Sequence, residues 1–162
     1  MKILIDTREQ KPFDMTTASF EGVEFEIVQQ KLDCGDYSVE GLKEIIAIER
    51  KASTGELYQN LAKVKMRERF HRELVLLNEV KHSYIICEFP ETAMFAFPKG
   101  SGIPKSKMKY LKMTSGYLRK LIHEIEDLYD TEIIYCEDRT EAERVTFNLL
   151  SEAWEKYGNI SS

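Results

Sequence analysis

The sequence lacks the features of a membrane protein and of a disulfide-linked secreted one. No run of about 18 apolar residues occurs, so no membrane-spanning helix is predicted. The chain begins with a predicted core strand and not with a charged and then apolar signal region. Its three cysteines, Cys34, Cys87 and Cys136, lie far apart without metal-ligand spacing, so we expect buried thiols in a reducing compartment. We therefore expect an intracellular protein, in the cytoplasm or, in a eukaryote, in the nucleus.

An excess of basic residues is also missing. The chain has 23 Lys and Arg against 28 Asp and Glu, a net charge of -5, which argues against a uniformly basic nucleic-acid surface. The charge is unevenly distributed, however, because residues 99–120 contain seven basic residues and no acid. Such a stretch can serve solubility, but we favour neutralisation of phosphates. The basic residues are Lys99, Lys105, Lys107, Lys109, Lys112, Arg119 and Lys120.

Length and composition predict one globular domain over residues 1–157, with 158–162 as a frayed tail, and the order of strands and helices that follows predicts the α/β class. Apolar alternation and short apolar runs predict strands over residues 3–5, 23–28, 37–39, 43–50, 83–89 and 132–136. Helical spacing predicts helices from residue 53 onward and over about 67–80, 117–128 and 139–157. Prolines and glycines mark residues 90–114 as a long loop, and loops of that length are commonly functional.

The hairpin between the third and fourth predicted strands carries three charged residues that can converge. Asp36 opens one strand, and Glu49 and Lys51 end the next. Because side chains alternate along a strand, Glu49 and Lys51 share a face while Arg50 points to the other. Two carboxylates beside a lysine can bind a divalent cation next to a group that steadies an attacking water or a phosphate. Taken alone, Asp36 also suits an Asx-turn, and Glu49 to Lys51 also suit a solvated strand end.

Two further sequence blocks sharpen this interpretation. The three blocks Ile5-Asp6-Thr7-Arg8-Glu9, Cys34-Gly35-Asp36-Tyr37 and Ile48-Glu49-Arg50-Lys51 follow one another in the order of a known nuclease signature. They resemble the XPF/Hef-type structure-specific endonucleases of the PD-(D/E)xK superfamily. The similarity also reaches Arg67-Glu68-Arg69-Phe70, and it covers residues 1–89 well and the remainder loosely. No helix-hairpin-helix or helicase domain of the larger family members is recognised in the chain.

The resemblance implies a restriction-endonuclease-like fold, in which helices flank a mixed central sheet within a single domain. It also implies a metal-dependent endonuclease that cleaves branched, flapped or otherwise structured DNA, with Mg²⁺ or Mn²⁺ as cofactor. Asp36 and Glu49 would be metal ligands, and Asp6 a further ligand, directly or through water. Lys51 would orient the attacking water and stabilise charge on the phosphate.

The resemblance extends to residues around these ligands. Arg8 and Glu9 would support Asp6, while Arg50 would order neighbouring carboxylates or bind a phosphate with two hydrogen bonds. The family has an Asp four residues after the signature lysine, where this chain has Gly55. The next residue, Glu56, is a secondary candidate that is better explained by a Ser-x-x-Glu capping box.

The predicted DNA contacts lie outside the signature, at Arg67, Arg69, Lys99, Lys105, Lys107, Lys109 and Lys112. The two arginines equally suit an ordinary exposed helix face, paired with neighbouring acids. Family nucleases work as dimers, so a homodimer or a recruited partner protein is expected. Two other functions remain open: a catalytically silent DNA-binding or scaffold subunit, and a single-strand or RNA nuclease of the same superfamily.

Overall fold

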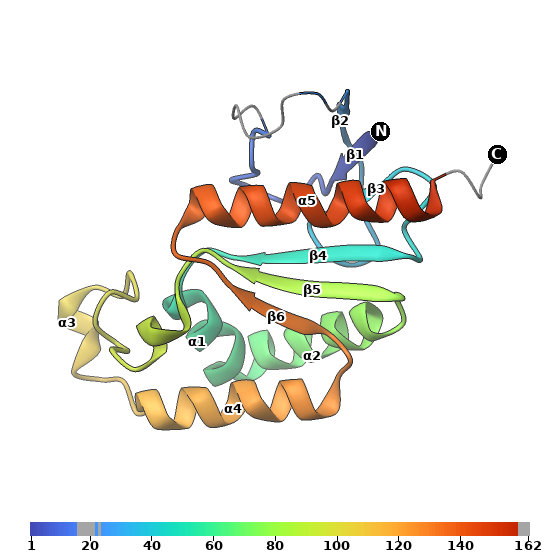
Figure 1. Ribbon diagram of the computed structural model, residues 1–162. Helices are drawn as coiled ribbons and strands as arrows, with labels where there is room; N and C mark the ends of the chain where they lie inside the picture. The colour runs from blue at the N-terminus through green and yellow to red at the C-terminus, as the bar shows by residue number, and fades with distance from the viewer. Residues whose placement is uncertain (16–21, 23, 159–162) are drawn as a thin grey trace.

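A computed structural model describes residues 1–15, 22 and 24–158 as a six-stranded sheet between two layers of helices (Figure 1). The strands are β1 (Lys2–Ile5), β2 (Glu26–Gln29), β3 (Tyr37–Val39), β4 (Ile46–Lys51), β5 (His82–Cys87) and β6 (Glu132–Tyr135). The helices are α1 (Thr54–Ala62), α2 (Val64–Asn78), α3 (Lys105–Met108), α4 (Ser115–Leu128) and α5 (Arg139–Tyr157), with a 3-10 helix η2 (Glu91–Met94). Within the described residues, no helix is long and apolar enough to cross a membrane.

The sheet is mixed, which confirms the expected α/β architecture. Its strand order is β2-β1-β3-β4-β5-β6, in which β3 runs antiparallel to both of its neighbours. Strands β4, β5 and β6 are parallel, and β1 is parallel to β2. The carboxyl ends of β4 and β5 therefore meet at one edge of the sheet, where Lys51 is paired with Cys87. This is the edge at which α/β folds commonly place their sites.

Side-chain alternation along β4 decides which residues meet which helix layer. Helix α5 covers one face of the sheet, and α1, α2 and α4 cover the other (Figure 1). Ile46 and Ile48 belong to the core on the α5 side, whereas Ala47 packs with the apolar residues of α1, α2 and α4. The same alternation sends Glu49 and Lys51 toward α1 and α2, and Arg50 toward α5. Glu49 and Lys51 therefore lie on the opposite face of β4 from Arg50, as the sequence predicts.

Most predicted boundaries agree with the structure, and the differences have local causes. Helix α5 has the predicted bounds, and the side chain of Asp138 caps its first turn. The predicted strand 43–50 begins too early, because the backbone N–H groups of Ile45 and Ile46 both bond to the carbonyl of Leu42 in a turn. Val23 of the predicted strand 23–28 and residues 159–162 of the predicted tail lie outside the described residues.

The expected long loop, residues 90–114, contains the short helices η2 and α3. Its base is anchored because Met94 and Phe97 are buried in the core beneath α1 and α4. The ring of Phe97 lies 5.5 Å from that of Tyr58 in α1, measured between ring centroids. The segment is thus fixed against the helix that follows β4, beside the sheet edge described above.

Candidate functional site

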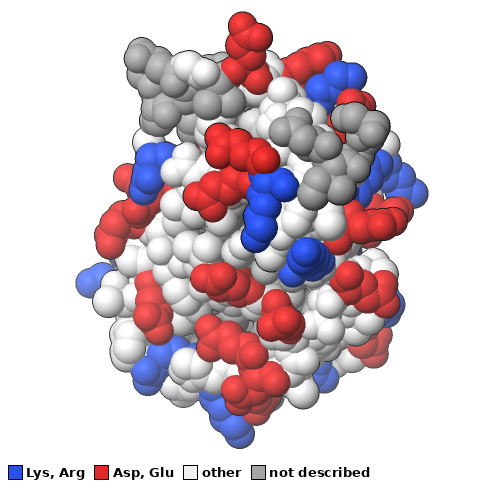
Figure 2. Space-filling view, turned by 45° about the vertical axis from the view of Figure 1, so that its right-hand side comes forward, with Lys and Arg blue, Asp and Glu red and all other residues white. Residues whose placement is uncertain are grey.

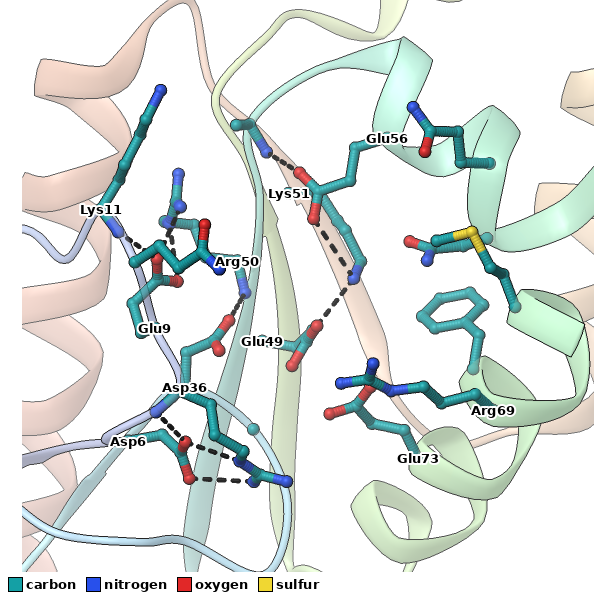
Figure 3. A pocket seen from close by; sticks show the side chains of 18 residues that line it. Asp6, Glu9, Lys11, Asp36, Glu49, Arg50, Lys51, Glu56, Arg69 and Glu73 are labelled. Atoms are coloured by element: carbon teal, nitrogen blue, oxygen red, sulfur yellow. Dashed lines mark hydrogen bonds and ion pairs between the residues drawn. The ribbon is translucent and has the colours of Figure 1, made fainter.

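A pocket of about 400 Å³ opens at the carboxyl end of β4 (Figure 3). Its walls come from the segment after β1, from the β3–β4 hairpin and from helices α1 and α2. Nine of the residues predicted from the sequence line it, namely Asp6, Arg8, Glu9, Asp36, Glu49, Arg50, Lys51, Glu56 and Arg69. Segments that are distant in the sequence therefore bring the three signature blocks to one cavity.

Glu49 and Lys51 form an ion pair at the pocket wall. Lys51 Nζ donates to Glu49 Oε1 at 2.7 Å and lies 4.9 Å from the centre of the Phe70 ring. Both charged side chains are almost fully buried. The second carboxylate oxygen, Glu49 Oε2, is buried and, among the described residues, receives no hydrogen bond from an N–H or hydroxyl group, while the neighbouring carboxyl that can share a proton with Glu49 is that of Glu73. A buried acceptor without a donor is unfavourable, so this oxygen is suited to bind a ligand from outside the protein.

Asp36 faces the same cavity from the start of β3. Its Oδ2 accepts the backbone N–H of Arg50 at 2.8 Å, so the side chain joins the two strands of the hairpin. This bond crosses the hairpin, unlike the local bond of an Asx-turn. Burial, followed by the negative charge of Glu49, raises the pKa of Asp36 well above its ordinary value. Two carboxylates that face one space repel each other, and a cation between them would relieve that repulsion.

Gly35 allows this close approach of the hairpin strands. It has a φ of +69°, in the left-handed region that glycine adopts without strain. A Cβ at this position would lie 3.0 Å from the carbonyl oxygen of Ile48 in β4. The glycine before Asp36 therefore sets the carboxylate against the opposite strand.

Asp36 and Glu49 together fit a hard divalent cation. Mg²⁺ is commonly held by one or two carboxylates and keeps several waters. Within the described residues, no group of three or more His, Cys, Asp or Glu side chains is arranged to hold a metal ion. The available protein ligands are therefore Oε2 of Glu49 and the carboxylate of Asp36. Mg²⁺ and Mn²⁺ both accept carboxylate oxygens as ligands.

The carboxylate of Asp6 is already hydrogen-bonded within the protein, unlike that of a free metal ligand. Its Oδ1 accepts the backbone N–H and the Nε of Arg8 at 2.7 and 2.8 Å. Its Oδ2 accepts Arg8 Nη2 at 2.9 Å and the backbone N–H of Leu32 at 2.7 Å. Burial alone would raise the pKa of Asp6, but the hydrogen bonds from Arg8 and Leu32 lower it to about 2. Both oxygens are occupied, so metal ligation by Asp6 would require the displacement of these donors.

Arg50 lies on the opposite face of β4 and orders two acids. It binds Glu9 through two nitrogens, at 3.1 and 2.9 Å, and Glu88 through a third at 2.7 Å. Arg139 of α5 binds the same Glu88 oxygen at 2.7 Å. Of the two roles expected for Arg50, the geometry matches the ordering of carboxylates. Glu9 supports Arg50, whereas Arg8 supports Asp6.

Glu56 has the capping role that its spacing predicts. Its backbone N–H bonds to Ser53 Oγ, and its Oε2 accepts the N–H of Ala52 at 2.8 Å. Its other oxygen lies 3.8 Å from Lys51 Nζ, so the side chain also faces the pocket. The preceding position excludes an acid, because a Cβ at Gly55 would clash with the backbone carbonyl oxygen of Ser101.

Sequence reasoning missed Glu73, which projects from α2 into the pocket beside Arg69 (Figure 3). Burial, then the charge of Glu49, raises the pKa of Glu73 to about 7. The signal available in the sequence was its spacing, four residues after Arg69 on the same helix face. That spacing indicates only an ion-pair partner of Arg69, because the sequence of the helix does not reveal which of its polar residues faces β4.

The predicted DNA contacts are divided among several places. Arg69 lines the pocket, whereas Arg67 is exposed and does not. Lys107 lines a second groove that adjoins the pocket. The remaining predicted lysines, Lys99, Lys105, Lys109 and Lys112, are exposed and line neither cavity.

Comparisons with known proteins agree with this geometry. A model of the ERCC4 domain matches residues 5–149. The solved structure of XPF from Aeropyrum pernix superposes with a TM-score of 0.64 at 16% sequence identity, over 99% of this chain and 68% of that one. XPF from Aeropyrum pernix in complex with DNA gives a TM-score of 0.61 at 17% identity, over 96% of this chain and 66% of that one. A search among curated proteins gives no match.

At these identities the superpositions show a shared fold, while the family model covers nearly the whole chain. The matched residues include Asp36, Glu49 and Lys51, which meet in the pocket. The chain therefore belongs to the ERCC4 domain family of XPF-type nuclease domains.

Proposed function

We propose that this chain is a metal-dependent endonuclease that hydrolyses phosphodiester bonds in branched, flapped or otherwise structured DNA. The observation that carries the proposal is the buried Oε2 of Glu49, which receives no N–H or hydroxyl hydrogen bond among the described residues, in a pocket shared with Asp36 and Lys51. Family membership supports this chemistry, and the Aeropyrum pernix XPF bound to DNA has the same fold. Mg²⁺ or Mn²⁺ is the proposed cofactor.

In this mechanism, the bound cation supplies an activated water and neutralises charge on the phosphate. The protein's own part is to hold charges where the reaction needs them. Although burial opposes it, the Glu49 carboxylate keeps the pKa of Lys51 above its ordinary value, so the ammonium remains charged. Lys51 is held in place by Glu49 and Phe70, and it donates to the attacking water or to a phosphate oxygen. Arg69 lines the opposite wall, and its proposed role is to bind a phosphate oxygen.

Two supporting roles follow from the same pocket. Asp6 and Arg8 act as a positioning pair that fastens Leu32, and with it the segment leading to Asp36. Arg50 and Glu9 fasten the segment after β1 to β4. Arg67 and the exposed lysines of residues 99–112 are proposed to contact the DNA backbone away from the scissile bond.

The direct test is cleavage by Asp36→Asn and Glu49→Gln on a labelled flap and fork with Mg²⁺ or Mn²⁺. Each variant should lose roughly a thousandfold or more in rate, since a cation at the phosphate contributes several kcal/mol to the transition state. Exposed acids of the same type, in Asp33→Asn and Glu44→Gln, are the matched controls and should cleave like the unaltered protein. Full activity in both pocket variants would contradict the proposal.

The same panel separates the other candidate functions. Salt-dependent DNA binding without cleavage in either metal, at any protein concentration, would identify a silent binding or scaffold subunit. Faster cleavage of single strands or RNA than of a flap would identify a different nuclease of the superfamily.

A dimer or a recruited partner is proposed because one small domain offers little surface for two DNA arms. Sedimentation that shows only a monomer with full fork activity would contradict that part.

A further inference from the structure

A second groove continues from the catalytic pocket. It has a volume of about 530 Å³ and lies between α1 and residues 101–111. Glu56 and Gln59 line both cavities, so the two spaces adjoin along α1. The groove residues with side chains suited to nucleic acid are Tyr58, Gln59, Lys63, Lys107 and Tyr110.

We propose that this groove binds unpaired nucleotides of a DNA arm that adjoins the scissile phosphate. The proposal rests on the nuclease function above and specifies its substrate. A strand whose phosphate lies at Lys51 can pass Gln59 and enter the groove without leaving the protein surface, because the cavities share that wall. Continuity with the pocket therefore identifies the occupant as the strand that is cut.

An exposed aromatic ring favours unpaired bases in this groove. Tyr110 is 72% exposed although it lines the groove, and Lys109 Nζ lies 4.9 Å from its ring centre. Aromatic side chains at the surface of single-strand binding proteins stack on bases, with little preference among them. A base within a duplex is already stacked on its neighbours, so Tyr110 can accept only a nucleotide that is not paired.

The charges of the groove suit a phosphate backbone. Lys63, between α1 and α2, and Lys107, in α3, are exposed and line it from its two sides. Among the described lining residues, Glu56 is the one acid, and it is engaged by the N–H of Ala52 and by Lys51. The groove thus combines free cations with a stacking surface, as sites for single strands do.

The walls of the groove are held in place before any ligand arrives. Gly55 lets the backbone of Ser101 approach α1 more closely than a Cβ would permit. Ser101 Oγ donates to the carbonyl of Pro98 at 2.6 Å and accepts the N–H of Ile103 at 3.3 Å. A preformed groove loses less conformational entropy on binding than one that must be assembled.

The first experiment measures binding without divalent cations, so that cleavage does not interfere. A flap with 2-aminopurine in its single-stranded arm, next to the junction, is titrated with the protein in EDTA. Stacking on Tyr110 should quench the fluorophore, and Tyr110→Phe should retain the quench while Tyr110→Ala loses it. Tyr117→Ala is the control, because Tyr117 is also exposed but does not line the groove. Lys107→Ala should lower the slope of log K against log salt by about one.

The second experiment compares cleavage of the flap with cleavage of a nicked duplex that lacks the arm. Tyr110→Ala should slow flap cleavage roughly tenfold, the effect of one lost base stack, and leave the nicked duplex unchanged. An unaltered rate on the flap, or equal losses on both substrates, would overturn the proposal, as would a retained quench in Tyr110→Ala. If the unaltered protein cleaves nothing, the nuclease function fails, yet the measurement in EDTA still decides whether the groove binds the arm.

Discussion

Substitution of Gly55 tests the packing that forms the site. Gly55 is the second residue of α1, directly after Thr54, and it is buried against the loop that contains Ser101. A Cβ there would clash with the carbonyl oxygen of Ser101, a backbone atom of a residue that is 2% exposed. Because that carbonyl cannot rotate away as a side chain could, Gly55→Ala must displace either the loop or the start of α1.

The expected cost can be compared with a matched glycine. Overpacking of this kind costs about 1–3 kcal/mol of the free energy of unfolding, even though alanine is up to about 1 kcal/mol better than glycine within a helix. Gly116 is the second residue of α4, and the nearest atom to its Cβ would be Thr114 Oγ1 at 4.0 Å. Gly116→Ala should therefore be neutral or slightly stabilising. Because the helix preference for alanine applies to both positions, the two variants should differ by the overpacking cost, about 1–3 kcal/mol.

Urea unfolding followed by linear extrapolation measures this difference directly. Equal slopes against urea would show that the variants expose similar surface on unfolding, so the free energies can be compared. If Gly55→Ala were as stable as Gly116→Ala, the contact between α1 and Ser101 would not be tight, and the explanation for the missing acid at this position would fall.

Two further substitutions test the ion pairs around the pocket. Asp6→Asn should lower the free energy of unfolding by about 1–2 kcal/mol at neutral pH, less than the full pKa shift implies because Arg8 is half exposed. Since folding lowers the pKa of Asp6 from 3.8 to about 2, this contribution is present above pH 3.8 and is lost as the pH falls through 2. Denaturant titrations of both proteins across that range should converge, and a constant difference would contradict the assignment. Arg50→Met leaves the buried Glu9 carboxylate without its cation and should lower the free energy of unfolding by about 3–5 kcal/mol. Arg67 is exposed, so Arg67→Met should lower it by less than about 0.5 kcal/mol. Urea unfolding measures both values.

Features that depend on local patterns were predictable from the sequence. The alternation of side chains in β4 predicted that Glu49 and Lys51 share a face opposite Arg50, and the structure has this arrangement. The Ser-x-x-Glu spacing predicted the start of α1, where Ser53 is the cap. Both follow from the geometry of one segment, which neighbouring residues alone can determine.

Features that depend on distant pairs were not predictable. The occupation of Asp6 depends on the N–H of Leu32, 26 residues later, and on the rotamer of Arg8. Arg50 is paired with Glu88, the residue directly after β5, and this pair could be predicted only by knowing that β4 and β5 are parallel neighbours. Glu73 faces Glu49 because of how α2 is rotated about its own axis. The apolar stripe of α2 is narrow, so the sequence pattern does not fix that rotation closely enough to tell which polar residue faces β4.

The proposed function requires a chain with a net charge of -5 to bind DNA, so the distribution of its charges decides where a strand would approach. Figure 2 turns the right-hand side of Figure 1, toward the amino ends of β4 and β5, halfway to the viewer, and acidic side chains predominate in that view. That side would repel a phosphate backbone. The carboxyl ends of the same strands carry the pocket and the groove, where Lys51, Arg69 and Lys107 are placed. In the proposed function, DNA would therefore approach the carboxyl ends of these strands, where Glu49 and Asp36 lie in the pocket.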